Sequence, residues 1–195
     1  MRAGGTSYAA AQRTGHSERE THDFYPTWPA ATRSLIAVEP FAGSIWEPAC
    51  GDGAMSRVLE AAGHEVISTD LVDRGFGDGD CDFLMEWKPR APNIVTNPPF
   101  RWAQQFVDRA LQLTTGKVAL FLRLAFLEGQ ERGRWLPSTP LARVWIMSRR
   151  VPIAKGRLPN SDEQGGGVIA FAWFVWEHGH SAPPSIGWLD WGQHA

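Results

Sequence analysis

The sequence WEPACGDGAM, at residues 46–55, decides the fold class of this 195-residue chain. The apolar residues before its glycines predict a short strand over residues 44–46, and the apolar spacing after them predicts a helix over residues 54–62. Gly51 and Gly53 allow the backbone to approach a ligand closely. Open α/β sheets bind ligands beyond the carboxyl ends of their strands. The stretch therefore predicts a strand, a turn at a ligand site and a helix.

Strand-like and helix-like segments alternate along the rest of the chain. Short apolar runs predict further strands at residues 66–69, 92–96, 118–122, 144–147 and 168–176. Helical patterns are expected at residues 29–38, at 102–113 and after residue 122 to about residue 135. This alternation predicts an α/β doubly wound sheet with helices on both faces. Residues 183–191 are expected to be irregular chain packed by their tryptophans.

Length and composition favour one soluble domain. Hydrophobic residues make up 43% and charged residues 21%, which argues against a disordered chain and against a membrane chain. The first thirty residues lack the apolar block of a secretory signal, so a cytoplasmic protein is expected. Residues 1–21 are predicted to form a flexible tail, and residues 22–195 a single domain. Cys50 and Cys81 have no spacing typical of a disulfide framework or a zinc site, so no metal is expected.

Basic residues gather in one stretch of the sequence. Residues 101–157 contain 11 lysines and arginines but only 3 acidic residues, a composition that can serve a polyanion. The alternative is an ordinary solvated face of helices. The candidates for DNA contact are Arg101, Arg123, Arg132, Arg134, Arg149, Arg150, Lys155 and Arg157.

An acid after the second predicted strand indicates a nucleoside cofactor. Asp70 follows Gly53 by 17 residues, close to the spacing of about 20 at which an acid receives ribose hydroxyls. Dinucleotide sites ordinarily have a third glycine where this chain has Ser56, and Glu47 places an acid just before the turn. This combination suits a cationic cofactor without phosphates. The alternative is an ordinary turn between a strand and a helix.

The stretch TNPPF, at residues 96–100, carries a second signal at the end of the third predicted strand. Two successive prolines hold the chain extended and donate no hydrogen bonds, which leaves carbonyl oxygens and the Asn97 amide facing the crevice. Phe100 adds a flat apolar surface. Such a set can accept the hydrogens of a planar amino group while stacking the ring that bears it. The alternative is a rigid turn after a buried strand.

Together, over about residues 22–190, these segments resemble the DNA N6-adenine methyltransferases that use S-adenosylmethionine, in particular the compact type of phages and prophages. The resemblance implies a Rossmann-like class I methyltransferase fold, with a mostly parallel sheet and an antiparallel C-terminal strand. It assigns the catalytic motif to Asn97, Pro98, Pro99 and Phe100. It assigns cofactor binding to Asp23, Tyr25, Thr27, Glu47, Pro48, Ala49, Gly51, Gly53, Asp70, Leu71, Asp82, Phe83 and Asn97.

The resemblance also implies a reaction and partners. A methyl group would pass from S-adenosylmethionine to the N6 amino group of an adenine flipped out of double-stranded DNA, without a metal. The chain has no room for the separate target recognition domain of larger members, so a homodimer is expected to hold the DNA. Two alternatives stay open. The same motif methylates RNA base amines and protein glutamines in other families, and a catalytically idle DNA-binding regulator would share the fold.

Overall fold

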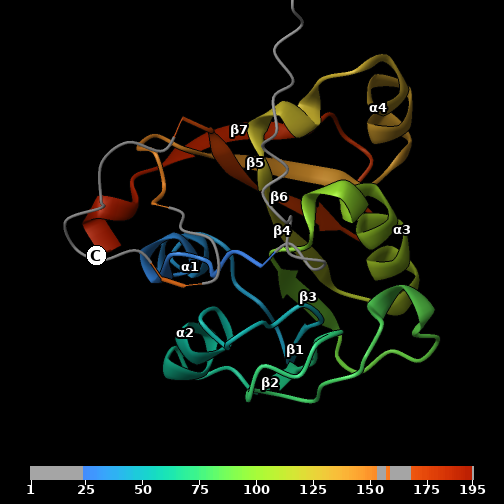
Figure 1. The fold of residues 1–195 in the computed structure, drawn as a ribbon. Coiled ribbons are helices and arrows are strands. Elements are labelled where there is room, and N and C mark those ends of the chain that lie inside the picture. Colours follow the sequence, from blue (N-terminus) through green and yellow to red (C-terminus); the bar gives the residue numbers. More distant parts are fainter. Residues whose placement is uncertain (1–23, 153–156, 159–167, 195) are drawn as a thin grey trace, which may run out of the picture.

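The computed structural model describes residues 24–152, 157–158 and 168–194, which form a seven-stranded sheet with helices on both faces (Figure 1). The strand order across the sheet is β2-β1-β3-β4-β6-β5-β7. The strands are β1 (Ile45–Glu47), β2 (Val66–Ser68), β3 (Asn93–Thr96), β4 (Lys117–Arg123), β5 (Leu141–Met147), β6 (Phe171–Glu177) and β7 (Ser185–Leu189).

The sheet is mostly parallel, as predicted. β2, β1, β3 and β4 pair in parallel, and β7 pairs in parallel with β5. Among the described strands, β6 is the one that runs against its neighbours, because it pairs antiparallel with both β4 and β5. Six consecutive residues of β6 are buried, as expected for a central strand covered on both faces.

Two apolar layers cover the two faces of the sheet. The main helices are α1 (Pro29–Ile36), α2 (Ser56–Ala61), α3 (Ala103–Leu113) and α4 (Gln130–Trp135). Residues of β4 alternate between the layers: Val118, Leu120 and Leu122 pack with α3, whereas Ala119 and Phe121 pack with α1 and α2. The continuous apolar run of β4 is therefore explained by burial on both faces.

The prediction that residues 183–191 are irregular was wrong, because Ser185–Leu189 form β7 at the sheet edge. A glycine in the middle of a five-residue run weakens the local strand signal. Tertiary packing requires that glycine, since a Cβ atom at Gly187 would lie 2.3 Å from the ring of Trp145. The predicted strand at residues 168–176 was also placed too early, because β6 begins at Phe171. Val168 lies before the strand and is 91% exposed.

No described helix is both long enough and apolar enough to cross a bilayer. The predicted tail at residues 1–21 lies outside the described residues, as do the cofactor candidate Asp23 and the DNA candidate Lys155.

Candidate functional site

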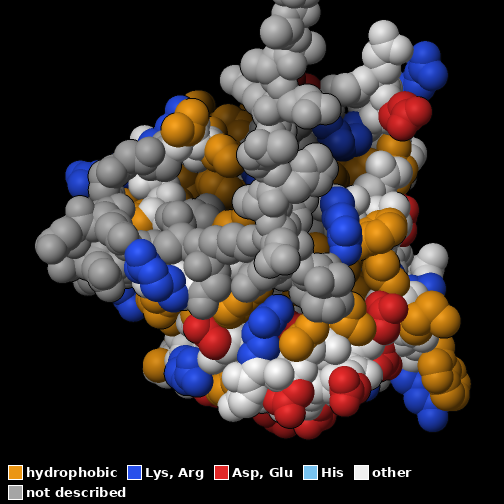
Figure 2. Space-filling model, viewed as in Figure 1, with side chains coloured by type: hydrophobic (Ala, Val, Ile, Leu, Met, Phe, Trp, Pro, Cys, Tyr) orange, Lys and Arg blue, Asp and Glu red, His pale blue; other side chains and the backbone are white. Residues whose placement is uncertain are grey.

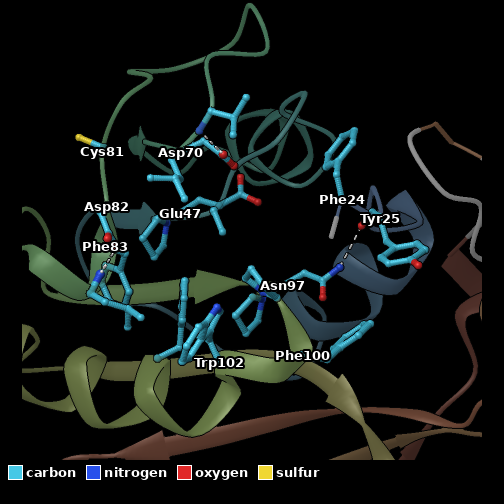
Figure 3. A pocket seen from close by; sticks show the side chains of 18 of the residues that line it. Phe24, Tyr25, Glu47, Asp70, Cys81, Asp82, Phe83, Asn97, Phe100 and Trp102 are labelled. Carbon is cyan, nitrogen blue, oxygen red and sulfur yellow. Dashed lines mark hydrogen bonds between the residues drawn. The ribbon is translucent and has the colours of Figure 1, made fainter. Parts of the chain in front are cut away.

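The described residues form a pocket of about 490 Å³ at the carboxyl ends of β1, β2 and β3 (Figure 3). Parallel pairing brings these three ends to one edge of the sheet, where the predicted motifs meet. The predicted site residues that line the pocket are Tyr25, Thr27, Glu47, Pro48, Ala49, Asp70, Leu71, Asp82, Phe83, Asn97, Pro98, Pro99, Phe100 and Arg101.

Two predicted residues, Gly51 and Gly53, lie beside the pocket and do not line it. Both have a positive φ, of 57° and 82°, which favours glycine. Phe24 and Phe76 cover them, since an added Cβ atom would lie 2.2 Å from the Phe24 ring at Gly51 and 2.6 Å from the Phe76 ring at Gly53. In the structure these glycines make room for two aromatic side chains of the chain itself.

Hydrogen bonds to the backbone fix the carboxylate of Asp70. One oxygen accepts from the Gly51 amide at 2.8 Å and the other from the Val72 amide at 2.9 Å. Each oxygen keeps a lone pair for a ligand, because a carboxylate oxygen can accept two hydrogen bonds. The bond to Gly51 ties the glycine turn to the end of β2. Asp70 is therefore held in place before any ligand arrives.

Glu47 lies at the end of β1 with 2% exposure and accepts a hydrogen bond from the Ser56 hydroxyl. Ser56 in turn lies 2.6 Å from the Ser68 hydroxyl. Burial raises the pKa of Glu47 well above its usual range, and the charges of Asp70 and Asp52 add to the effect. A cation in the pocket would favour the ionised form of this carboxyl group. The sequence pattern indicates no role for Ser56 beyond its place in the turn, and only the structure shows that its hydroxyl bonds Glu47.

Asp82 and Phe83 form another wall of the pocket. Asp82 caps a short 3₁₀ turn, Phe83–Met85, by accepting from the Leu84 amide at 3.0 Å. Phe83 is buried against the rings of Trp46 and Phe106, with centroid distances of 5.2 and 4.8 Å. Asp82 and Phe83 therefore present a carboxylate and a buried aromatic ring at the same wall of the pocket.

The side-chain amide of Asn97, directly after β3, has a defined orientation. Its nitrogen donates to the Tyr25 carbonyl oxygen at 3.1 Å and to the Thr27 hydroxyl at 3.0 Å. A backbone carbonyl oxygen can only accept a hydrogen bond, so the amide nitrogen of Asn97, and not its oxygen, must face Tyr25. The amide oxygen of Asn97 is buried and has no hydrogen-bond partner among the described residues. Figure 3 shows the amide between Tyr25 and Phe100, within the pocket. It is a positioned acceptor that lacks a donor.

Phe100 separates this pocket from a smaller groove of about 230 Å³. Its ring lies near that of Tyr25, with centroids 6.2 Å apart and an interplanar angle of 24°. The guanidinium of Arg123 lies 4.5 Å from the Phe100 centroid, and Arg123, Phe126 and Arg132 line the groove. Two cationic side chains therefore lie on the far side of Phe100 from the predicted cofactor residues.

The structure brings together only some of the predicted DNA-contacting residues. Arg101 is exposed at the pocket and lies over Trp102, while Arg123 and Arg132 line the groove. Arg149 instead forms an ion pair with Asp190, at 2.8 Å. The remaining described candidates, Arg134, Arg150 and Arg157, are exposed.

The fold is that of the Rossmann-like methyltransferases. A modification subunit described as part of a type I restriction enzyme from Vibrio vulnificus YJ016 is similar, with a TM-score of 0.53, 14% identity, and coverage of 86% of this chain and 46% of that one. The 23S rRNA methyltransferase ErmE has a TM-score of 0.52, 17% identity and coverage of 78% and 69%. Magnesium protoporphyrin IX methyltransferase from Synechocystis PCC 6803, solved with bound S-adenosylmethionine, has a TM-score of 0.50, 12% identity and coverage of 74% of each chain.

These similarities concern the fold alone. The chain spans less than half the length of the Vibrio subunit, so that protein's activity and partners do not transfer with the fold. No protein-family model matches this chain, and no curated protein sequence matches it. Among the described residues there is no group of three or more His, Cys, Asp or Glu side chains that could hold a metal ion, and Cys50 and Cys81 are free thiols.

Proposed function

We propose that the protein transfers a methyl group from S-adenosylmethionine to the N6 amino group of an adenine in DNA. The unpartnered amide oxygen of Asn97 supports this proposal most directly. A buried acceptor without a partner is costly, and a planar amino group supplies the missing donor. The adjoining carbonyl of Pro98 and the ring of Phe100 would accept a second hydrogen and stack the base.

The pocket residues fit S-adenosylmethionine. Glu47 is a buried carboxyl group whose raised pKa a cationic ligand would offset, and Asp70 is fixed with free lone pairs for ribose hydroxyls. Asp82 and Phe83 would hold the adenine of the cofactor. When bound, this cofactor would supply a methyl group already activated on a sulfonium: the carbon–sulfur bond would break as the nitrogen–carbon bond forms, S-adenosylhomocysteine would leave, and the extra proton on the nitrogen would pass to solvent.

The protein's own task is then to orient and desolvate the amino nitrogen. Asn97 would draw the amino hydrogens toward its oxygen and direct the nitrogen lone pair at the methyl carbon. Phe100 would hold the ring against rotation. Within a duplex the amino nitrogen cannot reach the pocket, so the target base would be flipped out of the stack.

The substrate class distinguishes this proposal from its alternatives, which are an RNA base amine, a protein glutamine and an idle regulator. Arg123, over Phe100, and Arg132, over Phe126 in the same groove, favour a nucleic acid, because the strand on either side of a flipped base carries phosphates. The test is transfer of a labelled methyl group to duplex DNA, RNA and a protein mixture in parallel. Mass spectrometry should find N6-methyladenine in the DNA, whereas label confined to RNA or protein, or no label at all, would refute the proposal.

We also propose that the two arginines of the groove, Arg123 and Arg132, contact DNA phosphates. Changing both Arg123 and Arg132 to glutamine should weaken duplex binding and reduce the slope of log K against log salt by about 0.9 per lost phosphate contact. Fluorescence anisotropy over a salt series measures both. Arg109→Gln is the matched control, since Arg109 lies on α3 and lines neither cavity. A triple variant with glutamine at Arg149, Arg150 and Arg157 tests the other predicted group of DNA-contacting residues. An unchanged salt slope in either variant would show that the arginines changed in it do not contact phosphates.

We also propose that the protein forms a homodimer in which the β7 strands of two copies pair. β7 pairs with β5 on one side, and no described strand covers its other edge. Ile186 and Trp188 are 55% and 68% exposed, and β7 contains no charged residue or proline to block pairing. Antiparallel pairing of two copies about Gly187 would place Ile186 of each copy opposite Trp188 of the other. The same segment thus supplies both halves of a twofold contact.

Trp188→Lys should convert the dimer to a monomer, because it places a charge in this contact. Light scattering, with and without DNA, measures the mass. Trp87→Lys is the control, since Trp87 is a comparably exposed tryptophan, at 74%, outside β7. A monomeric wild-type protein would refute the dimer, and a Trp188→Lys variant that stays dimeric would refute this interface.

A further inference from the structure

Arg74 is a cation in a pocket otherwise rich in acids. Glu47, Asp70 and Asp82 line the pocket, and the two cations among its lining residues are Arg74 and Arg101. Acidic side chains also gather on the surface around the loop after β2 (Figure 2). The exposed acids of that loop are Asp73, Asp78, Asp80 and Asp82. An anionic group of a ligand would be repelled here unless a cation receives it.

Of the two cations, Arg74 is the one held inside the site. Its guanidinium lies 4.3 Å from the centroid of the Phe24 ring, and that ring lies against Gly51. Arg74 is half-buried, whereas Arg101 is exposed and lies over Trp102. A guanidinium stacked on an aromatic face keeps its N–H groups directed outward in its own plane. Phe24 therefore positions Arg74 without using its hydrogen-bond donors.

A donor of Arg74 lacks a partner. Its Nε atom is buried without a hydrogen bond, and Arg74 forms no ion pair with any of the described residues. Buried guanidinium groups are normally paired, most effectively with the two oxygens of a carboxylate. The side chain is thus positioned, charged and unsatisfied at a wall of the pocket.

We propose that Arg74 binds the α-carboxylate of S-adenosylmethionine. This inference rests on the proposed function, because it takes that cofactor as the ligand. The cofactor carries a sulfonium, an ammonium and a single anionic group, the carboxylate. Arg74 contacts Phe24, whose ring lies against Gly51 of the glycine turn and which directly precedes Tyr25, a residue that the resemblance assigns to cofactor binding. Glu47, Asp70 and Asp82 would then face the cationic and hydroxyl groups of the cofactor.

This role makes Arg74 a cofactor-binding residue and not a catalytic one. The carboxylate is the same before and after methyl transfer, so an ion pair with it stabilises the bound cofactor and the transition state equally. Loss of Arg74 should therefore raise KM for the cofactor and leave kcat nearly unchanged.

The experiment compares S-adenosylmethionine with its decarboxylated form, which keeps the sulfonium and the amine. Calorimetry should show that Arg74→Gln weakens binding of S-adenosylmethionine by about 10- to 100-fold, as expected for loss of a charged hydrogen-bonding partner. Binding of the decarboxylated form should stay near the wild-type value. Arg57→Gln is the matched control, because Arg57 stacks on Phe76 over the other glycine, at 4.6 Å, without lining the pocket.

The outcomes separate this inference from the proposed function. A wild-type protein that binds neither compound would overturn both. If the wild type binds S-adenosylmethionine and Arg74→Gln binds it equally well, only the role of Arg74 fails. Equal weakening for both compounds would show that Arg74 supports the pocket structurally, which also overturns the carboxylate contact.

Discussion

Replacing Asn97 with alanine should reduce the rate of methyl transfer by about 10²- to 10³-fold, the usual effect of removing one preorganised hydrogen-bonding group at a reacting centre. The change deletes the buried amide oxygen that would accept from the adenine amino group. Cofactor binding should persist, because an interaction made mainly in the transition state acts on kcat. Single-turnover kinetics measures the rate, and calorimetry measures the affinity for S-adenosylmethionine.

A second variant separates the oxygen of Asn97 from its structural role. The Asn97 nitrogen also holds the Tyr25 and Thr27 segment, so alanine could act by loosening that segment. Thr27→Val removes one of these hydrogen bonds and leaves the Asn97 oxygen in place. Because Thr27 also lines the pocket, the comparison is made at saturating S-adenosylmethionine, where this variant should lose far less of the single-turnover rate than Asn97→Ala. Equal losses would assign Asn97 a purely structural role, and near-normal turnover of Asn97→Ala would refute the mechanism.

Glu39→Ala should lower the free energy of unfolding by about 2–4 kcal/mol, somewhat less than the loss of one partner of a fully buried ion pair, because Lys117 and Arg143 are partly exposed. Glu39, in the segment after α1, is 2% exposed. It accepts hydrogen bonds from Arg143 on β5, from Lys117 on β4 at 2.8 Å and from the Trp145 indole at 2.8 Å. Its loss removes the acidic partner of Lys117 and leaves Arg143 paired with the partly exposed Glu177 alone among the described acids. Urea unfolding measures the change.

Glu177→Ala is the matched control for this network. Glu177 pairs with the same Arg143, but its side chain is 41% exposed. Exposed ion pairs contribute little, so the expected loss is at most about 1 kcal/mol. Equal losses of unfolding free energy in the two variants would contradict the claim that the burial of Glu39 decides how much it contributes to stability.

The Glu39 network also predicts how stability depends on pH. Burial by itself raises the pKa of Glu39, but the hydrogen bonds from Arg143, Lys117 and Trp145 outweigh it, so the pKa lies below its ordinary value of 4.5. A lowered pKa in the folded state means that the stabilisation is complete above 4.5 and is lost as the pH falls through the folded value. The stability difference between wild type and Glu39→Gln should therefore be constant near neutral pH and shrink below pH 4.5.

The elements that build the pocket could be predicted because their signals are local. β1, β2 and β3 are short apolar runs that end in glycine, acid or proline turns within a few residues. Parallel pairing then brings their carboxyl ends to one edge, whatever the details of packing. This is why Glu47, Asp70 and Asn97 line one pocket, as the order of the motifs indicated.

β7 could not be recognised in this way. Its five residues are exposed except for Leu189 and the half-buried Gly187, so they show little of the alternation that marks a strand. What makes the segment a strand is its pairing with β5 and the close approach of the Trp145 ring to Gly187. Both depend on a segment some forty residues earlier in the chain.

The sequence by itself determined the α/β class, the positions along the chain of the strands that carry the motifs, and the kinds of chemical group at their ends. Only the tertiary structure decided how those groups are used. It orients the Asn97 amide through Tyr25 and Thr27, which lie 72 and 70 residues away, places Phe24 over Gly51, and places Arg74 in an acidic pocket. Propensity and periodicity act over a few neighbouring residues, whereas these contacts arise only when distant segments pack together.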